Sequence, residues 1–585
     1  MIIVGISAFY HDAACAVLAD GQLIAAAQEE RFTRRRFDPA VPINAFRACL
    51  RQAGVSISDI DCVAYYEDPA LKLSRQLWMG FPEVPQSGPG FMFRFDADRP
   101  YREIRERLGF TGPIMTVRHH EAHAASAFYF SGFPESALMT ADAVGEWTTM
   151  SYGRGGPAGI ELFEEVSFPH SIGLLYSTIT SYLGFEVNSD ENKVMGLAPY
   201  GQPSCVETLR ELVTDLPGGQ FRLSLDYFDF SGTGRMFTSR LDDLLGMLPR
   251  QPGAPIESAH ENLAASLQVL LEDILLGKAR YLAEVTGSEF LGYAGGVALN
   301  CVANSRIRAD GPFRDMFVQP AAGDAGGCAG AAALVHHRLA GTFTRRRLDD
   351  VRLGPEYDTR DLEKCLSGAG VTYADFAGDE AGLLARAARL LADGQVIGWF
   401  QGRMEFGPRA LGSRSILADP RQEHMRDHVN SVVKRRESFR PFAPAVVAER
   451  GREFFDLDFT SPFMLHTAQV RDRPGLPAVT HVDGTARVQT VERAADPRFH
   501  GLLTEFGTIT GYPVLLNTSF NLKGEPIVCT PADALMCFVR SGLDALVIGD
   551  LLLLREDTPG RWEGLVDAVA PILDRGISGD FYAFI

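Results

Sequence analysis

The chain has 585 residues, a length that favours two or three domains. Its composition, 46% hydrophobic and 22% charged, is ordinary for soluble globular domains. Its formal net charge of −18, from 74 acidic against 56 basic residues, disfavours sequence-independent nucleic-acid binding, because that binding needs a basic face. The nine cysteines are scattered and form no C-x-x-C, which disfavours a disulfide framework or a structural zinc site and favours a reducing compartment.

The N-terminal residues and the lengths of the apolar runs bear on targeting and on the membrane. The first residues form an apolar run without the basic region of a signal peptide, so we interpret them as a strand. The sequence contains no run of about 18 apolar residues that would predict a membrane span. We therefore expect a cytoplasmic protein with neither a membrane nor a nucleic acid as partner.

Two stretches of the first half share one strand pattern. Short β-rich runs separated by tight polar turns occur at 2–7, 14–18 and 23–27. A similar layout recurs at 137–140, 148–152 and 160–166. In each stretch an acidic residue, Asp12 or Asp142, follows the first strand. The repeat predicts a duplicated α/β domain.

The rest of the chain alternates between helix-like and strand-like stretches. In chain order we expect a helix at 257–286, a strand at 290–293, helices at 329–336 and 380–392, and strands at 394–400 and 512–516. Between 341 and 359 the sequence becomes polar and basic, which is typical of a domain boundary. We therefore predict a first domain at 1–345, a linker at 346–358 and a second domain at 359–585.

The densest group of histidines lies at 119–123. Because His119 and His123 are four residues apart, a helix would project both imidazoles from one face, as two nitrogen ligands of a metal require. On this spacing alone, a pair of ordinary surface or core histidines is an equally good interpretation. Asp142 and Asp324 follow predicted strands and offer carboxylate ligands, and such a mixed nitrogen and oxygen set suits iron, manganese or zinc.

Glycine-rich turns are a second candidate site. Gly295 and Gly296, followed by Asn300, would let backbone amides approach a nucleotide at the start of a helix, although a Gly-Gly pair after a strand is usually a plain turn. The chain has no G-x-x-x-x-G-K-[ST] motif, which excludes a P-loop as the phosphate site.

Basic residues crowd the stretch between 403 and 440. They are Arg403, Arg409, Arg414, Lys434, Arg435, Arg436 and Arg440. For any one of them a solvated charged face is the ordinary alternative, but their neighbours are apolar and turn-forming (FGPRALGSRSI, SFRPFAP), unlike a helix surface. Guanidinium groups in a rigid apolar frame suit bidentate capture of phosphate or carboxylate. Arg487, Asn517 and Ser519 would add donors.

Ten motifs of the chain resemble, in the same order and nearly end to end, the O-carbamoyltransferases of nodulation-factor and antibiotic biosynthesis, the NodU/CmcH/TobZ family. The motifs are GISAFYHDAA, EERFTRRRFD, HHEAHAASAF, DAVGE, NKVMGLAPYG, GGVALN, FGPRALGSRSI, KRRESFRPFAP, DGTARVQ and LLNTSFNLKGEPIV. The resemblance implies an α/β protein with a duplicated actin-like ATPase-type (ASKHA) domain, similar to the universal tRNA threonylcarbamoyl-transferase, followed by a YrdC-like α/β domain.

The same resemblance implies an ATP-dependent O-carbamoyltransferase. Its second domain would convert carbamoyl phosphate and ATP, with Mg²⁺, to carbamoyl adenylate, and its first domain, with a divalent metal that is typically Fe²⁺, would pass the carbamoyl group to a hydroxyl of a small-molecule natural product. The family also implies a homodimer. The alternative is a fused enzyme of tRNA threonylcarbamoylation, against which the net charge counts. An actin-like sugar or acetate kinase, or an ATP-binding chaperone, would not explain the arginine-rich second half.

Matching motifs carry the family's site residues to this chain. The metal ligands would be His119, His123, Asp142 and Asp324, with His120 pointing elsewhere. The adenylate contacts would be Gly145, Lys193, Gly295, Gly296 and Asn300. His11 and Asp12 would orient or deprotonate the acceptor hydroxyl. Carbamoyl phosphate would be held by Arg409, Lys434, Arg440, Arg487, Asn517 and Ser519.

Overall fold

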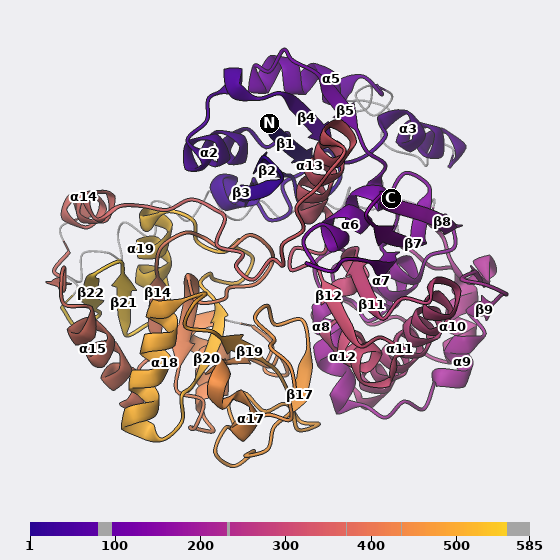
Figure 1. Cartoon of the computed structure of the whole chain (residues 1–585). Helices are drawn as coiled ribbons and strands as arrows, with labels where there is room; N and C mark the ends of the chain where they lie inside the picture. The colour runs from indigo at the N-terminus through magenta and orange to yellow at the C-terminus, as the bar shows by residue number, and fades with distance from the viewer. Residues whose placement is uncertain (80–95, 231–234, 370, 435, 558–585) are drawn as a thin grey trace. The chain divides into compact units, whose positions relative to one another are not determined.

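The chain folds into two compact units, which the computed structural model describes for residues 1–79, 96–230, 235–369, 371–434 and 436–557 (Figure 1). Unit 1 holds Met1–Glu29 and Phe37–Leu348, and unit 2 holds Glu30–Arg36 together with the described residues from Asp349 to Asp557. The division falls inside the linker predicted at 346–358, whereas the sequence-based boundaries assign Glu30–Arg36 to the first domain. Among the described residues, no helix is both long and apolar enough to cross a membrane.

Unit 1 contains two five-stranded sheets that share one topology. The first has the order β3-β2-β1-β4-β5, with β1 (Ile2–Ser7), β2 (Ala14–Ala19), β3 (Gln22–Gln28), β4 (Cys62–Tyr65) and β5 (Ile114–Thr116). The second has the order β8-β7-β6-β11-β12, with β6 (Ser136–Ala141), β7 (Thr148–Gly156), β8 (Gly159–Ser167), β11 (Phe290–Ala294) and β12 (Asp315–Val318). In each sheet the first three strands are antiparallel and the last two run parallel to the first. This repeat confirms the predicted duplication; kinship with the actin-like ATPases stays a prediction.

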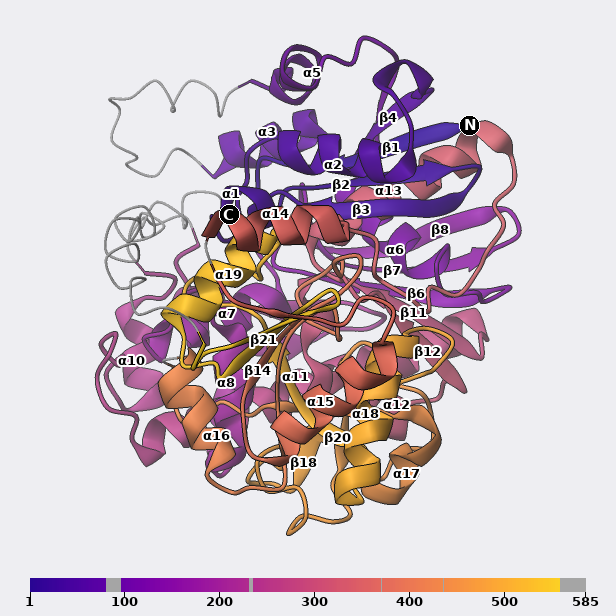
Figure 2. The same cartoon turned by 90° about the vertical axis from the view of Figure 1, so that its left-hand side faces the viewer.

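Two helices made largely of small residues lie between these sheets. Helix α13 (Asp324–Ala340) contacts β1 and β2, and helix α6 (His119–Phe128) contacts β6 and β11, while the two helices contact each other (Figure 2). A Cβ atom on Gly330 of α13 would lie 1.9 Å from the backbone oxygen of Ala122 on α6, so only glycine allows this approach. Because the helices are this close, the first turns of both can contribute side chains to one site.

The predicted helix at 329–336 is too short. Helix α13 begins at Asp324, so Gly326 and Gly327 belong to its first turn rather than to a loop. The glycines disguise the helix in the sequence, because glycine disfavours helix in isolation, whereas here it permits close contact with neighbouring elements. The long helix predicted at 257–286 is confirmed as α11 (Ser258–Thr286).

Unit 2 is built on one mixed eight-stranded sheet. Its order is β13-β22-β21-β14-β15-β20-β16-β19, with β13 (Ala374–Asp375), β22 (Leu551–Leu554), β21 (Ala545–Ile548), β14 (Ile397–Phe400), β15 (Arg414–Ala418), β20 (Val514–Ser519), β16 (Ala443–Val447) and β19 (Gln489–Val491). Only β14 with β21 and β16 with β19 pair in parallel. The structure thus confirms an α/β unit, and its YrdC-like character stays a prediction.

Both faces of the unit 2 sheet are covered by apolar side chains. Ile397 and Trp399 of β14 belong to a core with helices α15 (Glu380–Ala392) and α18 (Pro497–Thr510). Phe400 of the same strand belongs to the opposite core, which includes helix α19 (Pro531–Arg540). The alternation follows from the two-residue period of a strand. The sheet therefore forms the middle layer of the unit and holds the loops at its strand ends in place.

Candidate functional site

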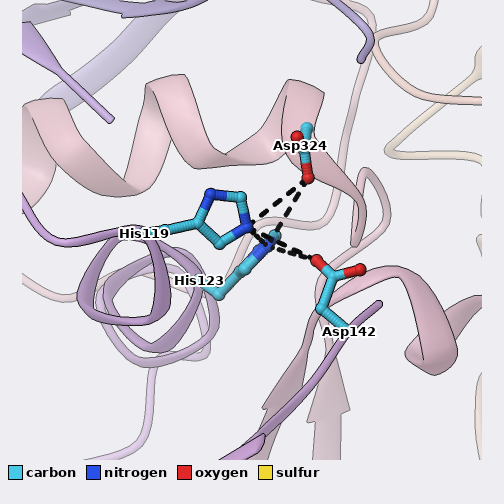
Figure 3. Close-up of side chains that lie close together, drawn as sticks. All are labelled: His119, His123, Asp142 and Asp324. Carbon is cyan, nitrogen blue, oxygen red and sulfur yellow. Dashed lines mark hydrogen bonds and ion pairs between the residues drawn. The ribbon is translucent and has the colours of Figure 1, made fainter. Parts of the chain in front are cut away.

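Four side chains of unit 1 converge at one point, as Figure 3 shows. His119 is the first residue of α6 and His123 lies one turn later, Asp142 follows β6, and Asp324 is the first residue of α13. The two histidine Nε2 atoms are 3.0 Å apart, and His123 Nε2 is 2.8 Å from Asp142 Oδ2. Asp324 Oδ1 lies 3.6 Å from Nε2 of His119 and 3.8 Å from Nε2 of His123. We call these four residues the metal group.

The spacing of the metal group suits a divalent transition metal. The four ligand atoms lie within 4.8 Å of one another. Metal–nitrogen and metal–oxygen bonds of about 2.1 Å place neighbouring ligand atoms roughly 3 to 3.5 Å apart. Two imidazoles and two carboxylates form a mixed set that suits iron, manganese or zinc better than magnesium. The structure therefore brings together all four metal ligands expected from the sequence.

Buried charges of opposite sign dominate this group. Burial alone would lower the pKa of His119, but the carboxylates of Asp324 and Asp142 outweigh that effect and raise it to about 9. Burial alone would raise the pKa of Asp142, yet the two histidines hold it well below its usual range. Burial raises the pKa of Asp324. A bound divalent cation would take over the charge balance that a histidine proton otherwise provides.

Two neighbours fix the geometry of the metal group. Tyr66, which follows β4, donates its hydroxyl to Asp324 Oδ2 at 3.2 Å, and its ring lies 5.2 Å from that of His119. The buried Glu146 accepts the backbone amides of His119 at 2.9 Å and of Asp68 at 2.7 Å. Neither Tyr66 nor Glu146 has a role predicted from the sequence. The position of Glu146, directly after the glycine of DAVGE, is a sequence feature that could have pointed to it. The sequence contains no such feature for Tyr66.

His120, the middle histidine, faces away from the metal group. Its Nδ1 atom is 2.6 Å from the hydroxyl of Thr140. Burial, and then the charges of His119 and His123, hold its pKa well below the usual histidine value. A neutral imidazole bonded to a buried hydroxyl has a structural role, which confirms the prediction that His120 points elsewhere.

His11 and Asp12 form a pair in the turn after β1. His11 Nδ1 is 3.3 Å from Asp12 Oδ2, and His11 Nε2 is 3.1 Å from the backbone oxygen of Asn188. Burial would lower the pKa of His11, but Asp12 and, further away, Asp324 raise it to about 9. Both ring nitrogens face oxygen atoms, so the ring acts as a donor in this arrangement. The part of this pair in handling an acceptor hydroxyl stays a prediction.

The glycine turn expected to contact the adenylate adjoins the metal group. A Cβ atom on Gly296 would lie 2.9 Å from Asp142 Oδ1, and one on Gly145 would lie 2.9 Å from His119 Cβ. Gly295 precedes Gly296 with a positive φ of 97°. Because neither Gly145 nor Gly296 has a side chain, the backbone can come close to the metal ligands there.

The other two expected adenylate contacts are engaged within the protein. Asn300 caps helix α12 (Cys301–Asp310) by accepting the backbone amide of Ala303 at 3.0 Å, and its amide donates to Gln268 at 2.9 Å. Lys193 forms an ion pair of 2.8 Å with Asp190. Both residues therefore have roles that need no ligand, and adenylate binding stays a prediction for this part of the site.

Unit 2 gathers charges of one sign. The Lys434 ammonium lies 2.5–3.2 Å from four oxygens that can share its three donors, the backbone and side-chain oxygens of Ser519 and of Asn521. Burial, followed by Arg436, lowers its pKa well below the usual lysine value. Burial, followed by Arg440 and Arg487, likewise lowers the pKa of Arg436. We call Lys434, Arg436, Arg440 and Arg487 the cation cluster. Mutual repulsion in such a cluster is relieved by an anion.

Asn517 and Ser519 belong to strand β20, whereas the sequence places them after a strand ending at 516. The Asn517 amide donates to the side-chain oxygen of Gln489 at 2.7 Å and to the backbone oxygen of Ala410 at 3.3 Å, next to Arg409. The structure thus links β20 to the FGPRALG loop and, through Lys434, to the cation cluster.

Two of the basic residues between 403 and 440 have structural roles. Arg414 is fully buried and donates to backbone oxygens of Gln401, Gly402, Ser413 and Pro355, with its guanidinium 3.6 Å from the ring centre of Phe400. Arg403 donates to the backbone oxygens of Leu353 and Gly354. Their charge-assisted bonds hold the chain where unit 2 begins. Arg435 lies outside the described residues.

Comparison with known proteins covers both units. The family model described as "Carbamoyltransferase N-terminus" matches residues 2–81 and 100–333, and "Carbamoyltransferase C-terminus" matches residues 388–555. The nodulation protein NolNO of Sinorhizobium fredii is 41% identical over 96% of this chain and 82% of its own length. An uncharacterised protein of Synechocystis is 42% identical over 96% of this chain and 97% of its own.

A third relative carries an enzyme name. The 3'-hydroxymethylcephem-O-carbamoyltransferase of Amycolatopsis lactamdurans is 28% identical over 92% of this chain and 97% of its own length. The chain belongs to the carbamoyltransferase family and is a transferase enzyme.

Proposed function

We propose that the protein is an ATP-dependent O-carbamoyltransferase that modifies a hydroxyl of a small-molecule natural product. Carbamoyl phosphate is hydrolysed to carbamate and phosphate. The carbamate oxygen then attacks the α-phosphorus of ATP and expels pyrophosphate, which gives carbamoyl adenylate. Finally the acceptor hydroxyl attacks the carbamoyl carbon, loses its proton, and releases AMP. Activation is needed because carbamate is a poor electrophile and AMP is a good leaving group.

Unit 2 carries the first two steps in this proposal. Carbamoyl phosphate and ATP are both polyanions, and the cation cluster supplies the positive charge that binds them. Arg409, Asn517 and Ser519 supply further donors around Lys434. Breakdown of carbamoyl phosphate needs cationic groups to stabilise the leaving phosphate and no side-chain nucleophile. The positive charges of the cation cluster repel one another, and a bound anion would relieve this repulsion. This supports placing the anions here.

Unit 1 carries the transfer step. The metal group would hold a divalent metal, for which we propose Fe²⁺, and the bound metal would stabilise the negative charge on the phosphate of the departing AMP. The Gly295–Gly296 turn lets the nucleotide approach Asp142 closely. His11 and Asp12 orient the acceptor hydroxyl, and the Asp12 carboxylate takes up its proton, a contribution of about 10²–10⁴-fold to the rate.

One observation carries the assignment: the four ligand atoms of the metal group lie within 4.8 Å of one another in a chain of the carbamoyltransferase family. The test is to incubate the purified protein with carbamoyl phosphate, ATP and a panel of hydroxylated natural products (sugars, aminoglycosides, macrolides and cephems). We expect pyrophosphate, AMP and a carbamoylated product in equal amounts for at least one acceptor. Carbamoyl transfer without AMP formation would contradict the adenylate route.

The same assay tests the competing acceptor class. With tRNA in place of the small molecules, we expect neither carbamoylated nucleoside nor salt-sensitive binding of sub-micromolar affinity. Such binding would favour a tRNA-modifying enzyme and overturn the proposed acceptor.

A further inference from the structure

A short piece of the N-terminal sequence belongs structurally to unit 2. Glu30–Arg36, which we call the strap, directly continues the segment after β3, yet it groups with the chain beyond Asp349. It begins with the single-turn helix α1 (Glu30–Thr33). Unit 2 is therefore not one continuous stretch of sequence. The strap contributes side chains to it from the N-terminal part of the chain.

Arg31 is the strap's buried contact to the FGPRALG loop. It is 4% exposed, and its Nη2 atom donates to the backbone oxygen of Gly407 at 2.8 Å, while Nη1 pairs with Glu30 at 2.8 Å. Gly407 has a φ of 123°, which L side chains rarely adopt, and Pro408 fixes its own φ and has no amide hydrogen. The bond from Arg31 therefore fixes the peptide that leads into Arg409.

The far side of the same loop is fixed from within. Glu405 Oε1 accepts the backbone amides of Leu411 and Ser413, both at 2.7 Å, and of Arg414 at 3.3 Å. Arg409 lies between this anchor and the anchor provided by Arg31. Without Arg31, the loop would keep only one of its two charged anchors.

The strap also contacts the loop next to Lys434. Arg34 donates to the backbone oxygens of Ile527 at 2.6 Å and of Pro526 at 2.8 Å. Just before these residues, Asn521 accepts from the Lys434 ammonium through its backbone and side-chain oxygens, and its amide donates to the backbone oxygen of Glu525 at 2.7 Å. Phe32 packs against a small apolar cluster made of Met404, Ala410, Ile527 and Cys529. The strap thus joins the two loops beside Arg409 and Lys434.

We propose that Arg31 is a positioning residue for the carbamoyl phosphate site. It acts through the Gly407 backbone oxygen, holding Arg409 ready to bind the phosphate, and does not itself contact the substrate. This inference rests on the proposed function, because it takes Arg409 as a carbamoyl phosphate ligand. Its physical basis is preorganisation, since a loop held in its binding conformation loses less entropy when the ligand binds.

The test compares Arg31→Ala, Arg31→Lys and the control Arg35→Ala in the full-length enzyme. Arg35 is an exposed residue of the same strap, so Arg35→Ala removes the same charge as Arg31→Ala. We expect Arg31→Ala to raise the KM for carbamoyl phosphate roughly tenfold, the loss of one charge-assisted bond, with KM for ATP and the metal content unchanged. Added guanidinium should restore part of the loss. Arg35→Ala should match the wild type.

The conservative variant keeps the test decisive if Arg31→Ala does not fold. Arg31→Lys retains the charge but not the fork geometry, so we expect a KM increase of about threefold. An unchanged KM in the variant that folds, or a loss confined to kcat without guanidinium rescue, would overturn the positioning role.

Arg409→Ala in the same assay separates the two levels of the argument. If Arg409→Ala leaves carbamoyl phosphate turnover unchanged, the proposed site itself is wrong. If Arg409→Ala abolishes turnover while Arg31→Ala has no effect, only the role of Arg31 fails.

Discussion

The metal group and the cation cluster solve opposite electrostatic problems. In the metal group, imidazoles and carboxylates of opposite sign hold one another, and their backbones begin or follow regular elements, α6, β6 and α13. In the cation cluster, burial and then neighbouring cations lower the pKa values of Lys434 and Arg436, and Lys434 is held by oxygens of Ser519 and Asn521. The first site is therefore held together by its own charges, whereas the second is held by its loops and, in our proposal, binds an anion.

The largest expected effect separates the two sites through the metal. Asp324→Ala removes one of four ligands, so we expect bound metal to be lost and acceptor carbamoylation to fall by at least about 10³-fold, while carbamoyl phosphate hydrolysis persists. Removal of the metal with a chelator should have the same effect and should be reversed by Fe²⁺. Metal analysis and product assays check this.

A matched control for the metal group lies on the same helix. Glu121 of α6 pairs with Arg338 at 3.1 Å and does not face the metal group. Glu121→Gln should therefore keep both metal and activity. Equal loss of hydrolysis and transfer in Asp324→Ala would contradict a division of labour between two sites.

Arg440→Ala tests the other side of the comparison. Because one of the cations that would bind carbamoyl phosphate is lost, we expect its turnover to fall roughly 10²-fold, as for a lost charge-assisted contact. Metal content should not change. Arg386→Ala, which removes an exposed charge from α15, is the control. A variant that loses metal, or that keeps normal turnover, would contradict the assignment of the anions to the cation cluster.

The residues of the metal group could be predicted from the sequence, because the patterns that mark them lie between near neighbours along the chain. A spacing of four residues places His119 and His123 on one helical face, and acids after strands mark Asp142 and, less directly, Asp324. The residues that support the group could not be predicted, since Tyr66 contacts Asp324 across 258 positions of sequence. A contact between residues so far apart leaves no periodic pattern in the sequence.

Unit 2 shows the same limit more strongly. Helix α15 matches its prediction at 380–392 because an amphipathic helix is a local pattern. The arginines of 403–440 could not be sorted from sequence, because Arg414 binds backbone oxygens whereas Arg440 adjoins other cations. The strap could not be assigned either, since Arg31 and Gly407 are 376 positions apart.

A smaller perturbation tests the rigidity of the metal group. In Gly145→Ala, the new methyl group would lie 2.9 Å from His119 Cβ and Cδ2 and from His120 Cδ2, so the first turn of α6 must shift. We expect metal affinity to fall roughly tenfold or more. Gly156→Ala, on β7 with no atom within 4 Å of the added carbon, should leave it unchanged. Unchanged affinity in Gly145→Ala would show that the ligands tolerate displacement.

The smallest expected effect concerns a single hydroxyl. Tyr66→Phe removes the bond to Asp324, whereas Tyr65→Phe removes bonds to the Ala8 backbone oxygen and to Glu67, away from the metal group. Both tyrosines are fully buried, so the two variants should lose similar thermal stability. Only Tyr66→Phe should weaken metal binding, by about fivefold for the loss of one hydrogen bond of about 1 kcal/mol. Competition with a chelator measures this difference. Equal weakening in both variants would mean that stability of unit 1, and not the orientation of Asp324, sets the metal affinity.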